Sequence, residues 1–543
     1  MIGEVDYLVV GGGSGGSVMA GRLSENADVQ VMLLESGGQG DSWLVKTPAA
    51  AVAMLPTRIN NHAFETVPQA GLNGRRGYQP RGKGLGGSSA INAMVYTRGH
   101  RNDYDHWAAL GNAGWSYDEL LPYFKRSENN ARIRDAFHGH DGPLHVSDLQ
   151  THNPFQQIYL QAAREAGFPI NHDFNGATQE GLGVYQVTQH KGERWSAARA
   201  YLHPHMGSRQ NLHVETGVQV TRILFEGRRA VGVECLQSGS LRVIRARREV
   251  VLCAGAFQSP QLLMVSGVGP GAHLQQQGIP VLHDLPGVGQ NLQDHPDFIF
   301  GYAAQSLNLM GISVGGTVHM AREALKYIRT RQGFMGTNYA EAGGFLKTDP
   351  TLAAPDVQLH FVVGLVENHA RQLHATHGYS CHVCVLRPKS RGQVTLAHAD
   401  ARQAPLIDPA FLAHDDDLET LLKGYKLTQQ LMNAPALASV RQKDVFTAGV
   451  QTDDEIRHLL RERTDTVYHP VGTCKMGTDA MAVVNPRLQV HGLEGLRVVD
   501  ASVMPTLIGA NTNATVIAMA EKAVDMMVAT QASHTDATRI HNT

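Results

Sequence analysis

The feature that most constrains the fold of this chain is its N-terminal stretch, residues 1–36, which reads as strand, glycine turn, helix, strand and acid. The four segments follow in chain order as strand 6–10, turn 11–16, helix 17–23 and strand 29–34. This order is that of the βαβ unit with which doubly wound α/β folds bind dinucleotides. A glycine cluster alone is more often an ordinary loop, but here both strands and the acid stand at the spacings from it that the βαβ unit requires. The stretch therefore predicts a dinucleotide site, and at this point both NAD and FAD are open.

The turn contains the pattern G-x-G-x-x-G at Gly11, Gly13 and Gly16, with Ser14 inside it. In this pattern the glycines serve a tight turn, the close approach of a pyrophosphate and helix–strand packing. The helix N-terminus that follows offers free N–H groups and a partial positive charge to the pyrophosphate. Glu35 ends the second strand. A carboxylate at this position can accept hydrogen bonds from the ribose hydroxyls.

The composition argues against several classes of protein. The chain has 543 residues, and its 47 basic and 49 acidic residues give a net charge of −2, which does not indicate a nucleic-acid partner. Five cysteines are a sparse and odd set, more typical of a reducing compartment than of a disulfide framework. The sequence lacks a basic segment before its first apolar run and any apolar run long enough for a transmembrane helix. It predicts a cytoplasmic protein and leaves open peripheral contact with the inner membrane, as well as the oligomeric state.

Two patterns that resemble metal or redox sites favour a structural interpretation. The 28 histidines include pairs such as His138 and His140, which have no matching set of cysteines or carboxylates, so we expect surface histidines and no metal. Cys381 and Cys384 match C-x-x-C, but they lie in a strand-like run without the strand–turn–helix context of a redox motif. We expect both cysteines to be ordinary strand residues.

A second glycine-dense block spans residues 75–94. Small residues let the backbone approach a flat or phosphorylated ligand and present N–H donors to it. Residues 90–96 resume a helical composition, which favours a loop anchored at both ends over a mobile one. The small residues of the block are Gly84, Gly86, Gly87, Ser88 and Ser89.

Residues 81–99, RGKGLGGSSAINAMVYTRG, and 255–269, GAFQSPQLLMVSGVG, resemble the two signatures of the glucose-methanol-choline (GMC) oxidoreductase family. The resemblance extends from Asp6 to about Met527. It implies an α/β fold (α+β overall), in which a Rossmann-like FAD-binding domain is interleaved with a substrate domain of a mixed sheet plus helices. The implied division is 1–155, 211–297 and 466–531 for the FAD domain, 156–210 and 298–465 for the substrate domain, and 532–543 for a tail.

The resemblance also implies FAD as the cofactor. Some members attach FAD covalently through a histidine in the second glycine block, and Ile91 stands at the matching position here, so we expect non-covalent FAD. Val220 is implied near the adenine end, and Asn513 also suits the cap of a final helix expected at 514–530. Beyond the first turn, the implied cofactor-binding residues are Gly86, Gly87, Ser89, Asn92, Ala93, Val220, Asp500, Ala501, Thr512 and Asn513.

His469, in the segment 466–477, resembles the active-site histidine of the family. The family chemistry is oxidation of an alcohol carbon with hydride transfer to flavin N5, which requires a base for the hydroxyl proton. Histidine suits this task because its ordinary pKa, about 6.5, lies close to neutral pH. Asn511 stands where relatives carry histidine or asparagine against the same substrate oxygen. We expect activity to rise with pH through the pKa of His469.

Three other polar residues are open to more than one interpretation. Asp294 and His295 suggest a catalytic role, but a structural turn where the chain passes between domains is the favoured prediction. Glu341 fits a pocket-lining residue and a structural carboxylate equally well.

The substrate follows from similarity to bacterial alcohol and sorbose dehydrogenases, which extends to residues 173–176, 183–188 and 386–392. It implies oxidation of a primary alcohol, with electrons passed to a quinone-like or dye acceptor. Choline dehydrogenase ranks second, because a quaternary ammonium favours an aromatic cage and the chain is only 6% aromatic. An alcohol oxidase using O2 is also open, as are a lyase or photoenzyme on this scaffold and a flavin-binding protein without catalysis.

Overall fold

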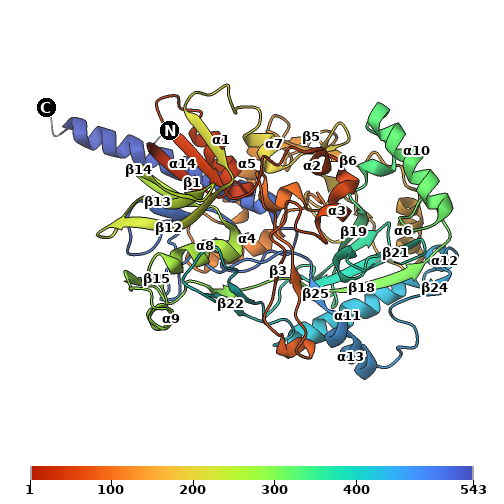
Figure 1. Ribbon diagram of the computed structural model, residues 1–543. Helices are drawn as coiled ribbons and strands as arrows, with labels where there is room; N and C mark the ends of the chain where they lie inside the picture. Colours follow the sequence, from red (N-terminus) through yellow and green to blue (C-terminus); the bar gives the residue numbers. More distant parts are fainter. Residues whose placement is uncertain (1–2, 373, 541–543) are drawn as a thin grey trace.

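The computed structural model describes residues 3–372 and 374–540, which build two large sheets with helices packed against them (Figure 1). Seven of the described strands form the first sheet. Six of them lie side by side in the order β11 (Leu212–Thr216), β2 (Val31–Glu35), β1 (Glu4–Val10), β14 (Ser240–Leu252), β13 (Arg229–Gln237), β12 (Val218–Glu226). The seventh strand, β26 (Leu496–Val498), pairs with the end of β14.

The strands of the first sheet that flank β1 run parallel, and β12 and β13 add an antiparallel extension. β14 changes partner along its length. Its first half pairs with β13, and its last three residues, 250–252, lie between β1 and β26. A strand from near the end of the chain therefore completes the sheet that the first residues begin.

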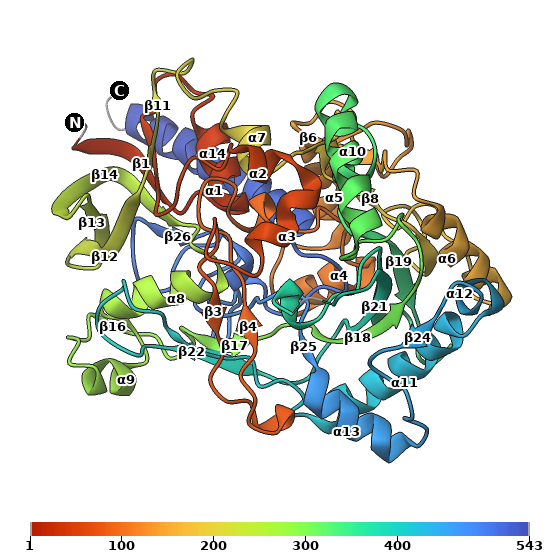
Figure 2. The ribbon, with the colours of Figure 1, turned by 45° about the vertical axis from the view of Figure 1, so that its right-hand side comes forward.

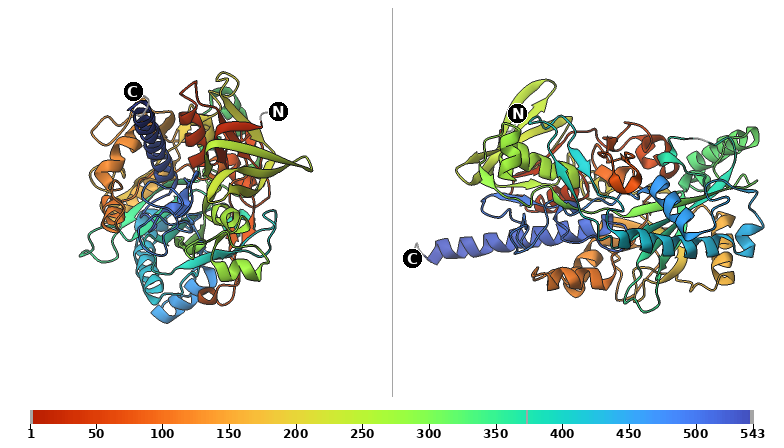
Figure 3. Two further views of the ribbon diagram at one scale, coloured as in Figure 1. Left: turned by 90° about the vertical axis from the view of Figure 1, so that its left-hand side faces the viewer. Right: turned by 90° about the horizontal axis from the view of Figure 1, so that it is seen from below.

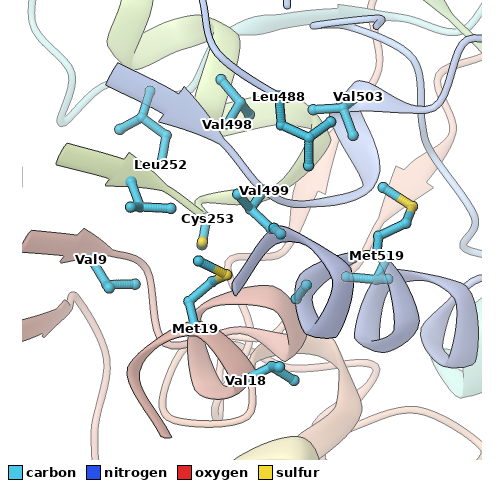
Figure 4. Packing of buried hydrophobic residues seen from close by; sticks show 14 of the residues in the cluster. Val9, Val18, Met19, Leu252, Cys253, Leu488, Val498, Val499, Val503 and Met519 are labelled. Atoms are coloured by element: carbon cyan, nitrogen blue, oxygen red, sulfur yellow. The ribbon is translucent and has the colours of Figure 1, made fainter. Parts of the chain in front are cut away.

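Helices cover the first sheet, and this explains why β1 and β2 are continuous apolar runs rather than alternating ones. The helices α1 (Ser14–Leu23) and α14 (Asn513–Ile540) pack against each other beside it. Figure 4 shows their side chains in one cluster with those of the strands, for example Met19, Met519, Val9, Leu252 and Val498. Every residue of β2 is buried.

The second sheet joins β24 (Lys443–Asp444), β18 (Pro296–Ala303), β21 (Gly378–Val385), β20 (Val357–Val362), β19 (Ala340–Leu346) and β7 (Gly181–Val184), with β25 (Asp465–Thr466) beside β18. All pairings described within it are antiparallel. Two sheets of different kind, with helices against both, confirm the predicted α/β (α+β overall) class. The division into domains at the given residue numbers stays a prediction.

Alternation along β20 divides the second sheet into two faces. Val357, Leu359 and Phe361 belong to an apolar cluster with the helices α6 (Pro154–Glu165) and α11 (Asp415–Met432). The residues between them, such as Gln358 and His360, therefore point to the opposite face. That second face is turned toward the cavity described below.

The remaining helices lie around these two layers, and α10 stands at the outer edge of the molecule (Figure 2). Figure 3 shows the end of α14 projecting from the rest of the structure. None of the described helices combines the length and apolar composition that a membrane crossing needs. Their bounds are α2 (Trp43–Lys46), α3 (Ala51–Met54), α4 (Arg101–Ala109), α5 (Tyr117–Ser127), α7 (Ala197–Tyr201), α8 (Gly255–Val265), α9 (Gly271–Gln276), α10 (Val314–Thr330), α12 (Pro435–Ala438) and α13 (Asp453–Arg463).

The helical stretch predicted at 90–96 is wrong. A single 3-10 turn, Gly87–Ala90, is followed by irregular backbone. Arg194 is buried beside it, and its Nη1 donates to the carbonyl oxygens of Ser89 (3.3 Å) and Asn92 (2.6 Å). The carbonyl of Met94 accepts from Thr188 N at 2.8 Å. These tertiary hydrogen bonds replace the ones that a helix would make.

The helices α4 and α5 are separate because Gly111 and Gly114 adopt φ values of +93° and +89° between them. One further helix boundary differs from the prediction. The last helix continues to Ile540 rather than ending at 530. The predicted tail, 532–543, is thus helical as far as Ile540, and its last three residues lie outside the described part of the chain.

Candidate functional site

A cavity of about 420 Å³ lies between the two sheets, and residues from both ends of the chain line it. His469 and Asn511 line it together with thirteen of the predicted cofactor residues, which are Gly11, Gly13, Ser14, Glu35, Gly87, Ser89, Asn92, Ala93, Val220, Asp500, Ala501, Thr512 and Asn513. Gly16 and Gly86 lie behind this wall. The structure thus brings the predicted residues together, while their assignment to FAD contacts stays a prediction.

The first glycine turn has the geometry that its pattern predicts. Gly11 has a φ of +100°, and a Cβ there would lie 2.5 Å from the carbonyl oxygen of Cys253. A Cβ on Gly16 would lie 1.9 Å from the carbonyl oxygen of Gly11, so this glycine allows helix–strand contact. A Cβ on Gly13 would meet nothing closer than 3.8 Å, and no side chain caps the start of α1 at this residue. The first N–H groups of α1 are therefore open to an anionic ligand in the cavity.

Glu35 ties the two glycine blocks together. Its Oε2 accepts from Gly12 N at 2.8 Å, and its Oε1 accepts from Gly37 N at 2.7 Å and from Gly84 N at 3.0 Å. A carboxylate has about four lone-pair positions, so Oε2 can accept one further donor. This remaining position suits a hydroxyl of a bound nucleotide.

The second glycine block is fixed against the first. Gly86 adopts a φ of +92°, and its N–H donates to the carbonyl oxygen of Gly12 at 2.7 Å. Ile91 lines the cavity and has no nucleophilic atom. Small residues, an uncapped helix start and a buried acid with an open lone pair are together the features that fit a dinucleotide.

The C-terminal segment completes the same wall. Ser14 Oγ donates to Asn513 Oδ1 at 2.6 Å, which joins the start of α1 to the start of α14. Asp500 accepts from Gly255 N at 2.8 Å and from Ser259 Oγ at 2.6 Å, so it joins the end of β26 to the start of α8. Residues 500–513 and the first glycine turn therefore form one rigid surface.

His469 is buried and makes three polar contacts, two with the adjacent residues Asp294 and His295 and one with Asn511. Its backbone N–H donates to Asp294 Oδ1 at 2.9 Å. Its Nδ1 lies 3.0 Å from Nδ1 of His295, and its Nε2 lies 3.2 Å from Nδ2 of Asn511. The contacts fix both the position and the plane of the imidazole ring.

The hydrogen bonds of His295 determine the tautomer of His469. Nε2 of His295 lies 3.1 Å from the carbonyl oxygen of Leu386 and 3.1 Å from that of Ile508. Carbonyl oxygens only accept, so this nitrogen carries the proton and Nδ1 of neutral His295 is an acceptor. Nδ1–H of His469 must then donate to it. We assign from this network an unprotonated Nε2 on His469, on the side of Asn511.

Asn511 is oriented in the same way. Its Oδ1 accepts from Thr97 Oγ1 at 2.8 Å and from Gln358 Nε2 at 3.0 Å. Its amide nitrogen therefore points toward Nε2 of His469. A lone pair and an amide donor lie side by side in the cavity, which is an arrangement that can receive a hydroxyl group.

Burial sets the charge of these groups. Desolvation, with the nearby His295 and His360, lowers the pKa of His469 well below its ordinary value. Desolvation also lowers the pKa of His360, which lines the cavity, to about 3. In contrast, burial raises the pKa of Asp294 to about 6. His469 is therefore neutral, and able to act as a base, over a wider pH range than an ordinary histidine.

The structural turn favoured for Asp294 and His295 stays a prediction, and the structure adds contacts that it did not include. The two residues lie between β17 (Gln290–Leu292) and β18, and both contact His469 directly. Asp294 also accepts from the hydroxyl of Thr466 at 2.5 Å, and Thr466 is the first residue of the segment that carries His469. The adjacent acid and histidine were a sufficient signal, but their partner lies too far along the chain for sequence spacing to indicate it.

Sequence reasoning missed Thr97, Gln358 and His360. Gln358 and His360 come from β20, where the alternation of apolar and polar residues places both on the face opposite the helices. The polar residues within the apolar run 357–363 were the available signal. Thr97 lies in irregular backbone and offered none.

Glu341 is structural. It does not line the cavity, and its carboxylate accepts from Thr337 Oγ1 at 2.6 Å, Gln156 Nε2 at 2.8 Å and Thr151 Oγ1 at 3.1 Å. Burial raises its pKa. Of the two alternatives for Glu341, the structure favours the second.

Cys381 and Cys384 are buried, unpaired residues of β21, as predicted. The surface position expected for His138 is wrong, because this residue is buried. Its Nδ1 lies 2.8 Å from Asp135 Oδ1 and its Nε2 lies 3.5 Å from Asp173 Oδ1. Both carboxylates also accept backbone N–H bonds, so we assign an ion-pair cluster there. That the protein has no metal stays a prediction.

The chain is similar to known proteins over most of its length. Models of the GMC oxidoreductase family match residues 5–297 and 388–520. The chain is 44% identical to an alcohol dehydrogenase (acceptor) of Pseudomonas putida over 96% of its own length and 95% of its relative's, and 42% identical to the mitochondrial choline dehydrogenase of Homo sapiens over 96% and 90%.

Among solved structures, pyridoxine 4-oxidase from Mesorbium loti superposes with a TM-score of 0.86 at 31% identity, covering 96% of this chain and 98% of that one. A formate oxidase variant of Aspergillus oryzae RIB40 gives a TM-score of 0.89 at 27% identity, covering 98% and 99%. The chain therefore belongs to the GMC oxidoreductase family, which confirms the predicted oxidoreductase class and FAD as its cofactor.

Proposed function

We propose that the protein oxidises a primary alcohol to the aldehyde, with His469 as the general base and non-covalently bound FAD as the cofactor. The observation that carries this proposal is the unprotonated Nε2 of His469 beside the amide of Asn511, in a cavity whose other wall suits a dinucleotide. Both groups reach one oxygen atom, which is what activation of an alcohol requires.

Each residue of the site has one task. Asn511 donates an amide hydrogen to the substrate oxygen and orients it, and His469 Nε2 takes the hydroxyl proton. His295 accepts from Nδ1–H of His469 and so keeps Nε2 unprotonated. FAD, when bound, supplies the acceptor for the two electrons that leave the alcohol carbon. A positioned general base of this kind contributes a factor of about 10²–10⁴ in rate.

The charges around the cavity favour an uncharged alcohol over choline. Among the described residues that line it, the carboxylates are Glu35 and Asp500, and both belong to the part of the cavity lined by the predicted cofactor-binding residues. The opposite end is lined by apolar residues such as Met310, Ile312 and Val362. A quaternary ammonium would gain little there. Choline remains the second candidate because choline dehydrogenases are 40–42% identical to this chain.

A panel of alcohols with a dye acceptor distinguishes these substrates. We expect higher kcat/KM for butanol or benzyl alcohol than for choline, because the carboxylates among the described lining residues, Glu35 and Asp500, lie in the predicted nucleotide-binding part of the cavity. A preference for choline would reverse the order. Replacing the dye by O2 in the same assay tests the alternative that the protein is an alcohol oxidase, as two of the structural neighbours are named oxidases.

The electron acceptor that we propose is a quinone, and the cytoplasmic location stays a prediction. Ile91 supports non-covalent FAD because it has no atom that could attach to the ring. Acid precipitation of the holoenzyme should release all of the flavin into the supernatant. Flavin that stays with the precipitated chain would contradict this part of the proposal.

The role of His469 is tested by anaerobic stopped-flow reduction of FAD-loaded His469→Ala. The reduction rate should fall by a factor of about 10²–10⁴, because the base is lost while the cofactor wall is unchanged. His458→Ala is the matched control, since this histidine is 71% exposed and forms an ion pair only with its helix neighbour Glu462 among the described residues. Reduction at the wild-type rate in His469→Ala would exclude it as the base.

A further inference from the structure

The helix α10 turns an apolar face to solvent. Val314, Val318, Leu325 and Ile328 are between 49% and 86% exposed, and their spacings of four, seven and three residues keep the side chains on one face. The buried residues of α10, Gly316 and Tyr327, lie on its other side. An amphipathic helix normally buries its apolar face, so this face has no partner within the described part of the chain.

The same apolar surface reaches the cavity. Leu307 and Ile312 are 45% and 53% exposed and extend it beyond the N-terminal end of α10. Leu307 lies against Gly315, where a Cβ would be 3.7 Å from its Cδ2. Met310, Gly311 and Ile312 line the cavity. The apolar face therefore begins at the rim of the substrate end.

A row of basic residues borders this face. Arg322, Lys326 and Arg329 are exposed and are spaced by four and three residues, so they form one row beside the apolar one. No carboxylate in the described part of the chain forms an ion pair with Arg322 or Arg329. Lys326 lies 3.9 Å from Glu323, whose carboxylate is turned inward to accept from Phe334 N at 2.7 Å. The border is therefore positively charged.

We propose that α10 docks the enzyme on an anionic lipid bilayer, with the apolar face in the headgroup–acyl boundary and the basic row against the lipid phosphates. A helix with an exposed apolar stripe beside Lys and Arg is typical of such interfacial helices. The charge favours this partner over a second copy, because two basic rows would repel each other. Docking in this position places the rim of the cavity at the membrane surface.

The consequence for activity rests on the proposed function. A lipophilic alcohol or a quinone dissolved in the bilayer would reach the cavity at Ile312 without passing through water. The docking itself is independent of the reaction, since it depends only on α10 and the lipid. The two proposals can therefore fail separately.

The test is flotation of the FAD-loaded enzyme with vesicles of phosphatidylcholine alone or mixed with phosphatidylglycerol. We expect partitioning onto the mixed vesicles, little onto phosphatidylcholine, and release at high salt. The variant Leu325→Glu/Ile328→Glu should lose more than about tenfold in the partition coefficient. Changing Arg322, Lys326 and Arg329 to Gln should cost about fivefold for each charge and remove the preference for the anionic lipid.

Leu241→Glu is the matched control, because Leu241 is 66% exposed but belongs to the first sheet, and it should bind vesicles as the wild type does. Soluble dye should be reduced at the wild-type rate by all these variants. Failure of the wild type to float with mixed vesicles, or normal flotation of Leu325→Glu/Ile328→Glu, would overturn the proposal. So would a vesicle-free dimer that this variant dissociates in sedimentation equilibrium, since α10 would then bind a second copy. An enzyme that floats but oxidises no alcohol would refute the proposed function alone.

Discussion

The contact between the neutral histidines His295 and His469 determines which ring nitrogen of His469 carries the proton. His295 donates to two carbonyl oxygens through Nε2 and accepts from His469 through Nδ1, so one residue that never meets the substrate decides where the proton of another lies. In free histidine both tautomers are populated. The structure therefore assigns His295 as a positioning residue, whose effect on rate is mediated by His469.

Replacing His295 tests this assignment. His295→Leu removes the acceptor, so His469 is no longer held in the active tautomer and flavin reduction should slow by at least about tenfold. His295→Gln restores an acceptor oxygen and should recover part of the rate. The measurement is anaerobic flavin reduction at saturating alcohol, with FAD content as a control for folding. Equal rates in the two variants would show that His295 only fills space.

The pH dependence should differ from that of an ordinary histidine base. Burial lowers the pKa of His469 well below 6.5, and a base is active when neutral, so its deprotonation should leave no rising limb near pH 6.5. Burial raises the pKa of Asp294 to about 6, and loss of its negative charge below that pH should slow the reaction.

A pH profile of flavin reduction in wild type and Asp294→Asn separates the two groups. In the wild type the rate of flavin reduction should rise with pH near pH 6. In Asp294→Asn the rate should be low and should not change near that pH. A limb that persists in Asp294→Asn would assign it to a different group. The rise of activity with pH near 6 could then come from a histidine with an ordinary pKa.

At the scale of elements, two glycines at the start of α1 have different neighbours: Gly13, the N-cap residue, and Gly15, in the first turn. A Cβ on Gly15 would lie 2.2 Å from the carbonyl oxygen of Val499, whereas a Cβ on Gly13 would be 3.8 Å from its nearest neighbour. Gly15→Ala should therefore destabilise the packing of α1 on the end of β26 by about 1–3 kcal/mol. Gly13→Ala should fold normally but bind FAD less tightly, because its methyl group faces the ligand.

Thermal unfolding of the apoprotein and titration with FAD measure these two effects separately. The prediction is a lowered Tm for Gly15→Ala and a raised Kd with unchanged Tm for Gly13→Ala. If both variants lost only FAD affinity, Gly15 would belong to the binding surface rather than to the packing. An unchanged Kd in Gly13→Ala would place the pyrophosphate elsewhere.

The sequence was most informative where local pattern decides structure. The strands at 6–10 and 29–34 could be predicted from apolar runs, and the turn at 11–16 from its glycines. The helix predicted at 90–96 failed because a distant residue, Arg194, takes the carbonyl oxygens of this segment. His469 and Asn511 were predicted from motif resemblance, but the contact of His469 with His295 arises from folding across most of the substrate domain.

At the scale of the whole molecule, buried neutral histidines make stability depend on pH. The pKa values of His295 and His360 are both lowered from 6.5 to about 3 by burial. Between these values the unfolded state binds more protons than the folded state, so the free energy of unfolding falls as the pH drops below 6.5. At pH 5 each histidine costs about 2 kcal/mol. Asp294, with its pKa raised to about 6, offsets part of this loss.

Between pH 7 and pH 5 these three groups should together lower the free energy of urea unfolding by about 2–3 kcal/mol, and His62 and His145, whose pKa values are lowered to about 4, should add to the total. His360→Leu removes one titrating group and should make the loss smaller by about 2 kcal/mol. His458→Leu, at an exposed position, should leave it unchanged. A pH dependence that is the same in His360→Leu and wild type would contradict the assignment of a buried, neutral His360.

The strand β26 and the helix α14 are made late in translation, although both complete the site that the first residues begin. The floor of the cofactor site needs β26 beside β14, and the hydrogen bond of Ser14 needs Asn513. A ribosome that adds about 5–20 residues per second reaches that asparagine roughly half a minute or longer after it has made the glycine turn. During that interval the edge of β14 that β26 will cover is unpaired, and the nascent chain cannot yet hold its flavin as the finished protein does. Complete binding of FAD must therefore wait until the segment through Asn513 has been made, and conditions that slow translation before this segment should prolong the need for a chaperone.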